Sequence, residues 1–275
     1  MKNYILFYAA MLLTPLCLVI LIGCSDTANK ALPDAYDTGR LRIKFNNVVG
    51  DQKLELNQAT YKTGLGEDFV VTKFNYFVSN VRLIKNDGTT YTIPQDSSYF
   101  LIQEDIKATQ LITLNNIPTG EYNAVEFMVG VDSLRNTAPI EKRKGVLDPA
   151  GSTSEDGMYW AWNSGYIFLK LEGISSVGNP VNGKFYYHIG LFGGYNERTV
   201  NNTRIVKLNF GDQKVSVTMD QIPTVSISAD VQKVLNGPGT TLKIEEFNSI
   251  MGGQPLKAQE VANNYAGMFA MQKAI

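Results

Sequence analysis

Two tryptophans and one histidine are the residues of this chain whose types and spacing could do chemistry. The segment Gly157–Phe168 contains both tryptophans, Trp160 and Trp162, two positions apart. Residues two apart in a β-strand point to the same face, so the two indoles would form one large aromatic surface. Such a surface either fills the core of a β-sandwich or lines a binding site, and the residues alone leave both interpretations open.

His188 is the single histidine of the chain and follows Phe185-Tyr186-Tyr187. An imidazole here is either a functional group or a half-buried, hydrogen-bonded structural residue. A Ser-His-Asp hydrolase is not expected, because no Gly-x-Ser-x-Gly elbow precedes a helix. Adjacent acids such as Glu104-Asp105 point apart on a strand, and although the two acids of a glycosidase can come from distant strands, nothing in the sequence selects such a pair. We therefore predict no catalytic residues and a protein that is not an enzyme.

The N-terminus has the features of a bacterial lipoprotein leader. Lys2 precedes an apolar run that ends in Leu21-Ile22-Gly23-Cys24, a lipobox. We predict a signal peptide over residues 1–23, lipidation of Cys24 and a polar tether over residues 24–39. The alternative is a transmembrane anchor of marginal length. The expected location is the cell envelope of a Gram-negative bacterium, lipid-anchored on the periplasmic face or at the cell surface.

Composition excludes several classes of partner and stabilising bond. The chain has 25 Lys+Arg against 26 Asp+Glu, and Lys142-Arg143-Lys144 does not amount to a basic stripe, so no nucleic acid partner is expected. The two cysteines are Cys17, inside the leader, and Cys24. The mature domain then has no disulfide and no thiol ligand, and its core alone must stabilise it.

The remaining chain consists of short alternating segments separated by turn residues. Leu41 to Phe45 places apolar residues on one face and basic residues on the other, which is the period of a strand. We predict an all-β, antiparallel β-sandwich forming a single domain over residues 40–271. A C-terminal amphipathic helix is predicted from Pro255 to about Met271. Further strands are predicted at 69–84, 99–102, 122–131, 166–171, 184–189, 203–210, 214–218 and 224–229, and the irregular stretch Asp132–Asp156 is expected to be functional or mobile.

Several segments, in order, resemble the MbnP-like family over about Leu41 to Phe269. They are Phe74–Asn80, Gly130–Asn136, Leu147–Pro149, Gly157–Gly173, Tyr187–Gly190 and Ala262–Phe269. Members of this family are exported β-rich proteins named for the copper-binding partner protein of methanobactin gene clusters. The resemblance thus implies an exported β-rich domain that binds copper.

The family resemblance also implies a site. It would combine His188 with a tryptophan, Trp160 or Trp162, that a partner dihaem cytochrome c peroxidase-like enzyme oxidises to kynurenine. The aryl amine and carbonyl of kynurenine are potential ligands that the indole lacks, and the Met158 thioether would suit copper(I). Tyr159, Tyr166 and Tyr187 would donate hydrogen bonds around the site or simply pack.

This chain departs from the copper proteins related to the family, which have at least two histidines at the metal. With one imidazole, a carboxylate such as Asp156 would have to complete the coordination. The alternative function is a metal-free cell-surface lipoprotein. It would bind a protein or a glycan through the Asp132–Asp156 loop and the aromatic surface.

Overall fold

The computed structural model describes residues 37–150, 157–160, 165–211 and 215–272. The predicted signal peptide, Cys24, most of the tether, Asp156 and Trp162 lie outside the described residues, so the predictions made for them stay predictions. Tyr36–Ile275 form one compact unit. Within the described ranges, none of the helices has the length and apolar character needed to span a bilayer.

The first sheet is built around β1 (Thr38–Val49), in which apolar and polar side chains alternate. Its neighbours are β15 (Thr224–Asp230), which runs parallel to it, and two antiparallel strands. The two antiparallel strands are β7 (Leu111–Pro118) and β2 (Gln52–Lys53). The fifth strand, β17 (Phe269–Met271), pairs with β15.

The second sheet is built around β4 (Asp68–Lys85), the longest strand described. Two antiparallel strands follow each other along one edge of β4: β11 (Leu169–Ile174) pairs with Val70–Tyr76, and β8 (Gly120–Val129) pairs with Val78–Lys85. The opposite edge of β4 pairs with β6 (Tyr99–Gln103) and β5 (Thr90–Thr92), and the start of β4 pairs with β3 (Tyr61–Lys62). Beyond β8 lie β13 (Arg204–Asn209) and β14 (Val215–Val217), and beyond β11 lie β12 (Lys184–Ile189) and β16 (Ser249–Ile250).

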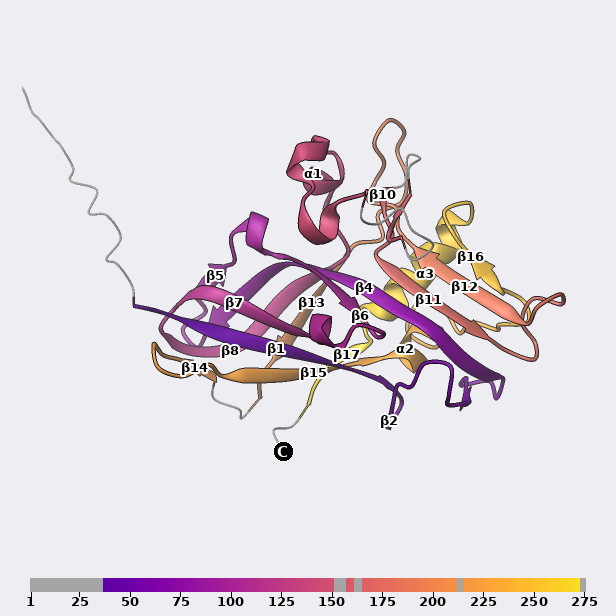
Figure 1. Cartoon of the computed structure of the whole chain (residues 1–275), viewed down its shortest axis with the longest axis horizontal. Coiled ribbons are helices and arrows are strands. Elements are labelled where there is room, and N and C mark those ends of the chain that lie inside the picture. Colours follow the sequence, from indigo (N-terminus) through magenta and orange to yellow (C-terminus); the bar gives the residue numbers. More distant parts are fainter. Residues whose placement is uncertain (1–36, 151–156, 161–164, 212–214, 273–275) are drawn as a thin grey trace, which may run out of the picture. The chain divides into compact units, whose positions relative to one another are not determined.

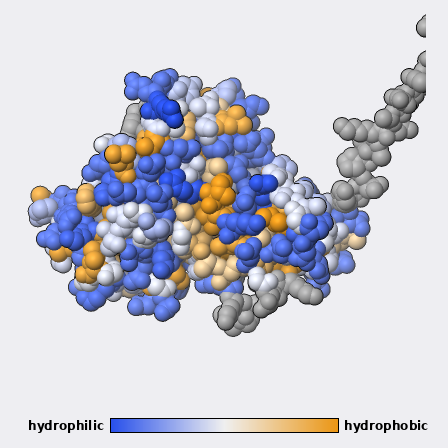
Figure 2. Space-filling view, turned by 180° about the vertical axis from the view of Figure 1, so that it is seen from behind, coloured by the Kyte–Doolittle hydropathy of each residue, from blue (hydrophilic) through white to orange (hydrophobic). Residues whose placement is uncertain are grey.

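The two sheets, around β1 and around β4, lie over each other (Figure 1). Their inner faces pack around a cluster of aromatic side chains. Phe45 of β1, Tyr76 of β4, Phe127 of β8 and Phe269 of β17 meet edge to face, with ring centroids 5.0 to 6.2 Å apart. The surface seen from behind is mostly hydrophilic, with an apolar area near its centre (Figure 2). The predicted all-β sandwich is confirmed, and its strands are antiparallel except for β1–β15 and β12–β16.

The predicted C-terminal helix begins at the expected residue but is shorter than predicted. α3 (Pro255–Tyr265) has proline in its first turn and buries Val261 and Tyr265. The prediction that it continues to Met271 is wrong, because Phe269–Met271 form β17 on the edge of β15. The free edge of β15 offers backbone hydrogen bonds to this segment, and Phe269 enters the aromatic cluster. α3 packs against the short helix α2 (Val231–Leu235).

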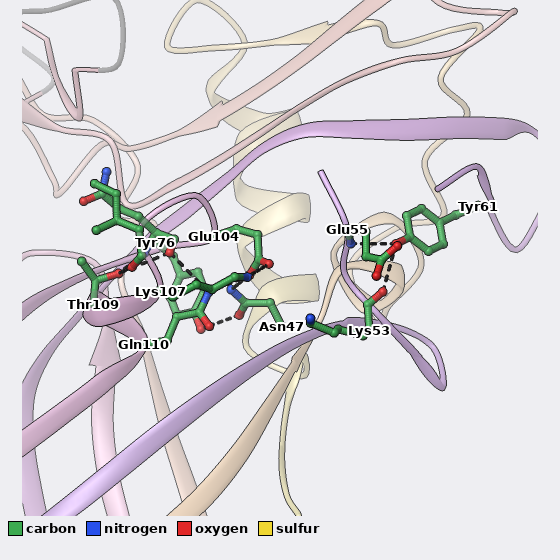
Figure 3. Close-up of polar contacts among 11 residues, drawn as sticks. Asn47, Lys53, Glu55, Tyr61, Tyr76, Glu104, Lys107, Thr109 and Gln110 are labelled. Carbon is green, nitrogen blue, oxygen red and sulfur yellow. Dashed lines mark hydrogen bonds and ion pairs between the residues drawn. The ribbon is translucent and has the colours of Figure 1, made fainter. Parts of the chain in front are cut away.

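A buried polar network links the two sheets (Figure 3). Tyr76 of β4 donates to Asn47 of β1 at 2.9 Å, and the Asn47 amide donates to Glu104 Oε2 at 2.9 Å. Gln110 donates to the same oxygen at 2.7 Å, and Lys107 pairs with the other. Burial and the charge of Glu104 raise the pKa of Tyr76 well above its ordinary value, so its hydroxyl remains a donor at neutral pH. Glu104, 4% exposed, is the common acceptor of the network.

Replacing Glu104 by leucine should destabilise the fold. The substitution leaves the buried amide of Asn47 and the partly buried amide of Gln110 without their acceptor. We expect a loss of about 2–4 kcal/mol in the free energy of unfolding, measured by urea denaturation. Glu126→Leu is the control: its carboxylate pairs with Arg82 at the surface, and we expect a loss of less than about 1 kcal/mol. Equal losses for the two variants would contradict a structural role for the network.

Candidate functional site

The outer face of the second sheet, turned away from the sandwich core, carries a row of polar side chains. Asn75 on β4, Lys170 on β11 and His188 on β12 are register partners across three adjacent strands. Their strand neighbours Leu171 and Tyr187 belong to the core, so the polar residues share the opposite face. Tyr187, expected beside the site, therefore lies on the other side of the sheet from His188.

His188 is paired with a carboxylate on this face. Its Nε2 lies 2.7 Å from Glu172 Oε1, and the two side chains are 13% and 20% exposed. Burial acts to raise the pKa of Glu172, but the hydrogen bond to His188 and the charges of His188, Lys170 and Lys73 outweigh it. The pKa of Glu172 is thus lowered, and the carboxylate is an anion at neutral pH.

Trp160 lies on the same face as His188, at the end of β12. It belongs to β9 (Tyr159–Trp160), which pairs antiparallel with β10 (Gly165–Tyr166). A Cβ on Gly190 would lie 2.8 Å from Cζ3 of the indole, so the ring rests on the backbone at Gly190. Gly190 follows His188 by two residues, a spacing of about 7 Å along a strand. The Trp160 ring therefore contacts the chain two residues after His188, on the face that carries the imidazole.

Met158, the predicted thioether ligand, lies in a second apolar cluster. It is 1% exposed and packs with Phe77, Tyr166 and Phe168 on the outer side of β4. Next to this cluster, Lys170 Nζ donates to the Gly157 carbonyl at 2.7 Å. The segment Gly157–Trp160 therefore covers the polar row with one part and the apolar cluster with another.

The loop after β8 holds the β9–β10 pair in place. Asn136, from α1 (Ser133–Asn136), accepts from the Tyr166 backbone N–H at 3.1 Å and donates to the Val131 carbonyl at 2.7 Å. The Tyr166 hydroxyl donates to the Leu147 carbonyl, and Arg143 donates to the Tyr159 hydroxyl at 3.0 Å. The described part of the loop predicted to be functional or mobile thus packs against the β9–β10 pair and supports it.

Asp132 anchors this loop to the sheet. It accepts from the Tyr99 hydroxyl at 2.5 Å, from the Asn80 amide at 3.0 Å and from the Arg135 backbone N–H at 2.9 Å, which caps α1. Burial acts to raise the pKa of Asp132, but these hydrogen bonds outweigh it and lower the pKa. Asp132 therefore stabilises the fold as a carboxylate.

Sequence reasoning missed three members of the polar row, Asn75, Lys170 and Glu172. For Lys170 and Glu172 the signal was the alternation in Leu169-Lys170-Leu171-Glu172, which places both polar residues on one face. That face is shared with His188 only through the pairing of β11 with β12. Among the described residues no group of three or more His, Cys, Asp or Glu could hold a metal ion. By ligand type His188 and Glu172 fit copper, and the described residues add no third donor of these types.

These features define a β-sandwich protein with a candidate ligand site on the outer face of one sheet. The MbnP family model matches residues 38–252, and the chain belongs to the MbnP family. The solved structure of MbnP from Methylosinus trichosporium is similar to this chain, with a TM-score of 0.59 and 15% identity, covering 87% of this chain and all of the other. That likeness supports the fold. No curated protein matches the chain.

Substituting Gly190 by alanine should displace the Trp160 ring. The added Cβ would lie 2.6 Å from the Tyr166 carbonyl oxygen and 2.8 Å from Trp160 Cζ3. We expect a loss of about 1–3 kcal/mol in the free energy of unfolding and an altered near-ultraviolet circular dichroism spectrum. Gly253→Ala is the control, because no atom lies within 4 Å of the added carbon. An unchanged spectrum in Gly190→Ala would show that the ring does not rest there.

Substituting Asp132 by asparagine should reduce stability in a pH-dependent way. The folded-state pKa of Asp132 is lowered, so its contribution is complete above the unfolded value of about 4 and is lost as pH falls through the folded value. At pH 7 we expect the variant to lose about 1–3 kcal/mol of the free energy of unfolding, measured by urea denaturation. The difference between variant and wild type should become smaller below about pH 4, measured in the same way at each pH. Asp105→Asn, an exposed position, should change little. A loss that is the same at every pH would refute the proposed role of the carboxylate.

Proposed function

We propose that this chain is an exported lipoprotein, anchored through Cys24, that binds copper at His188 and does not catalyse a reaction. The proposal is supported above all by the contact of the Trp160 indole with Gly190, two residues after His188, on the outer face of the second sheet. Family membership supports it at a coarser level. Copper in this proposal is a cargo to be acquired or stored.

Glu172 would set the orientation of the His188 imidazole. In the tautomer with a proton on Nε2, that nitrogen donates to Glu172 at 2.7 Å, and Nδ1 is left as the coordinating atom. A carboxylate that orients a metal-binding histidine also raises the basicity of the ligand. The lowered pKa of Glu172 supports this role, because the carboxylate stays anionic at the pH where an imidazole binds a metal.

The further donors would come from a modified tryptophan. The oxidant, supplied by a partner dihaem cytochrome c peroxidase-like enzyme, would be reduced as the C2–C3 bond of the indole is cleaved and each of the two carbons gains an oxygen atom. Hydrolysis would then release C2 as formate and leave kynurenine, which has an aryl amine and a carbonyl. Trp160 is only partly buried, which would let a partner reach it. Trp162 and Asp156 lie outside the described residues and remain alternatives for the modified residue and for a carboxylate ligand. Met158 is enclosed by apolar neighbours, and its thioether is a weaker candidate ligand than His188.

The test combines copper binding with intact mass on protein purified from its native envelope. We expect a gain of about four mass units, tryptophan to kynurenine, mapped to Trp160 or Trp162. His188→Ala should abolish tight copper binding, and Glu172→Gln should weaken it about 10- to 100-fold, measured by competition with a chromogenic chelator. Glu126→Gln, which removes a carboxylate elsewhere on the second sheet, should bind as the wild type does.

Two results would contradict this function. One is native protein with unmodified indoles and no copper although the peroxidase-like partner is present. The other is an unchanged copper affinity in His188→Ala. Either result would favour the alternative, a metal-free lipoprotein that binds a protein or a glycan through the loop after β8.

A further inference from the structure

A cavity separate from the His188 site lies in the loop after β8. It encloses about 590 Å³ between Tyr99 and Arg135 on one side and residues 141–147 on the other. The residues that line the cavity do not include His188, Glu172 or Trp160. Volumes of roughly 300–1,000 Å³ are typical of small-molecule sites. The cavity is therefore large enough for an organic ligand.

The lining combines positive charge with an apolar wall. Arg135, Lys142 and Lys144 contribute three cations, and Asp96 and Glu141 contribute two anions. Asp96 is 88% exposed and pairs with Arg135, so these two charges balance each other and Lys142 and Lys144 face one remaining anion, Glu141. The lining therefore has a net positive charge.

The apolar wall lies on residues next to these lysines in the chain. Val146 is 41% exposed and Leu147 is buried, with its other side in the second apolar cluster. A cavity that places ammonium groups beside an exposed aliphatic surface suits a ligand that has both an anionic group and an apolar body.

The site is held in shape by contacts within the protein. The Arg135 side chain is 11% exposed, donates to the Lys142 carbonyl at 2.5 Å and lies 5.0 Å from the centroid of the Tyr99 ring. The Tyr99 hydroxyl donates to Asp132, and burial followed by this hydrogen bond raises the pKa of Tyr99 to about 12. A ligand would therefore meet a preorganised wall and lose less free energy on binding.

We infer that this cavity binds a small organic anion, a carboxylate or sulfonate on an apolar body. Its charged group lies against Lys142 and Lys144, and its apolar part lies on Val146 and Leu147. Arg135 positions the Lys142 backbone and the Tyr99 ring around the ligand. This inference is independent of copper, because it uses none of the residues proposed to bind the metal.

The probe is 8-anilino-1-naphthalenesulfonate, a fluorescent aromatic sulfonate, titrated into the folded full-length protein. We expect one saturable site whose affinity falls as salt is added. Lys142→Glu/Lys144→Glu should weaken binding about tenfold or more, and Val146→Asp should weaken it in the same direction. Lys207→Glu, an exposed lysine on β13, is the matched control and should bind as the wild type does.

Thermal unfolding of each variant separates loss of the site from loss of the fold, because all four positions replaced are partly or fully exposed. Wild-type affinity in the double variant, or equal weakening in Lys207→Glu, would overturn the inference. So would the absence of saturable binding. Copper binding by the double variant should equal that of the wild type, so failure of this cavity is distinguishable from failure of the proposed copper site.

Discussion

The structure depends on one constraint, the burial of both faces of the central strand β4. Phe74, Tyr76 and Val78 face the sandwich core, while Asn75 and Phe77 face the other way and are equally inaccessible. A strand buried on both sides needs a second layer over its outer face. Here the second layer is the β9–β10 pair together with the loop after β8, so the segment that contains the tryptophan is part of the fold.

The segments that carry the family resemblance serve this second layer. Gly130 has a φ of +112°, and a Cβ there would lie 2.8 Å from the Phe168 ring. Glycine is therefore required both for the turn and for the close approach of Phe168. Asn80, with a φ of +51°, directs its amide to Asp132. Residues far apart in the chain thus support the layer that carries Trp160. Because these residues belong to the fold, the sequence segments that resemble the family contain structural residues as well as candidate ligands.

The alternation of apolar and polar residues predicted most strands because it reflects burial of one face of a strand. It failed where other interactions determine the structure of a segment. β7 was missed because its apolar positions, Ile112, Leu114 and Ile117, lose the period of two at Asn116, whose φ is +56°. The helix end was misplaced because the apolar spacing of Met268 and Phe269 fits a helix as well as a strand edge. His188 was found because it is the single histidine, whereas Glu172 gains its role only from the register of β11 with β12. Cross-strand pairing of this kind has no local signature.

The segment Gly157–Trp160 lies over two different environments, one apolar and one polar. The Met158 and Tyr166 side chains lie over apolar neighbours, where packing fixes them, whereas the Gly157 carbonyl lies over the buried Lys170. Beside Lys170, the fully buried Asn75 amide has no hydrogen-bond partner in the part of the chain that the structure describes, a cost of about 1–3 kcal/mol. An apolar residue at that position would give the sandwich a larger free energy of unfolding. The polar row therefore stabilises the fold less than apolar residues would, and the apolar cluster next to it packs the other part of the same segment.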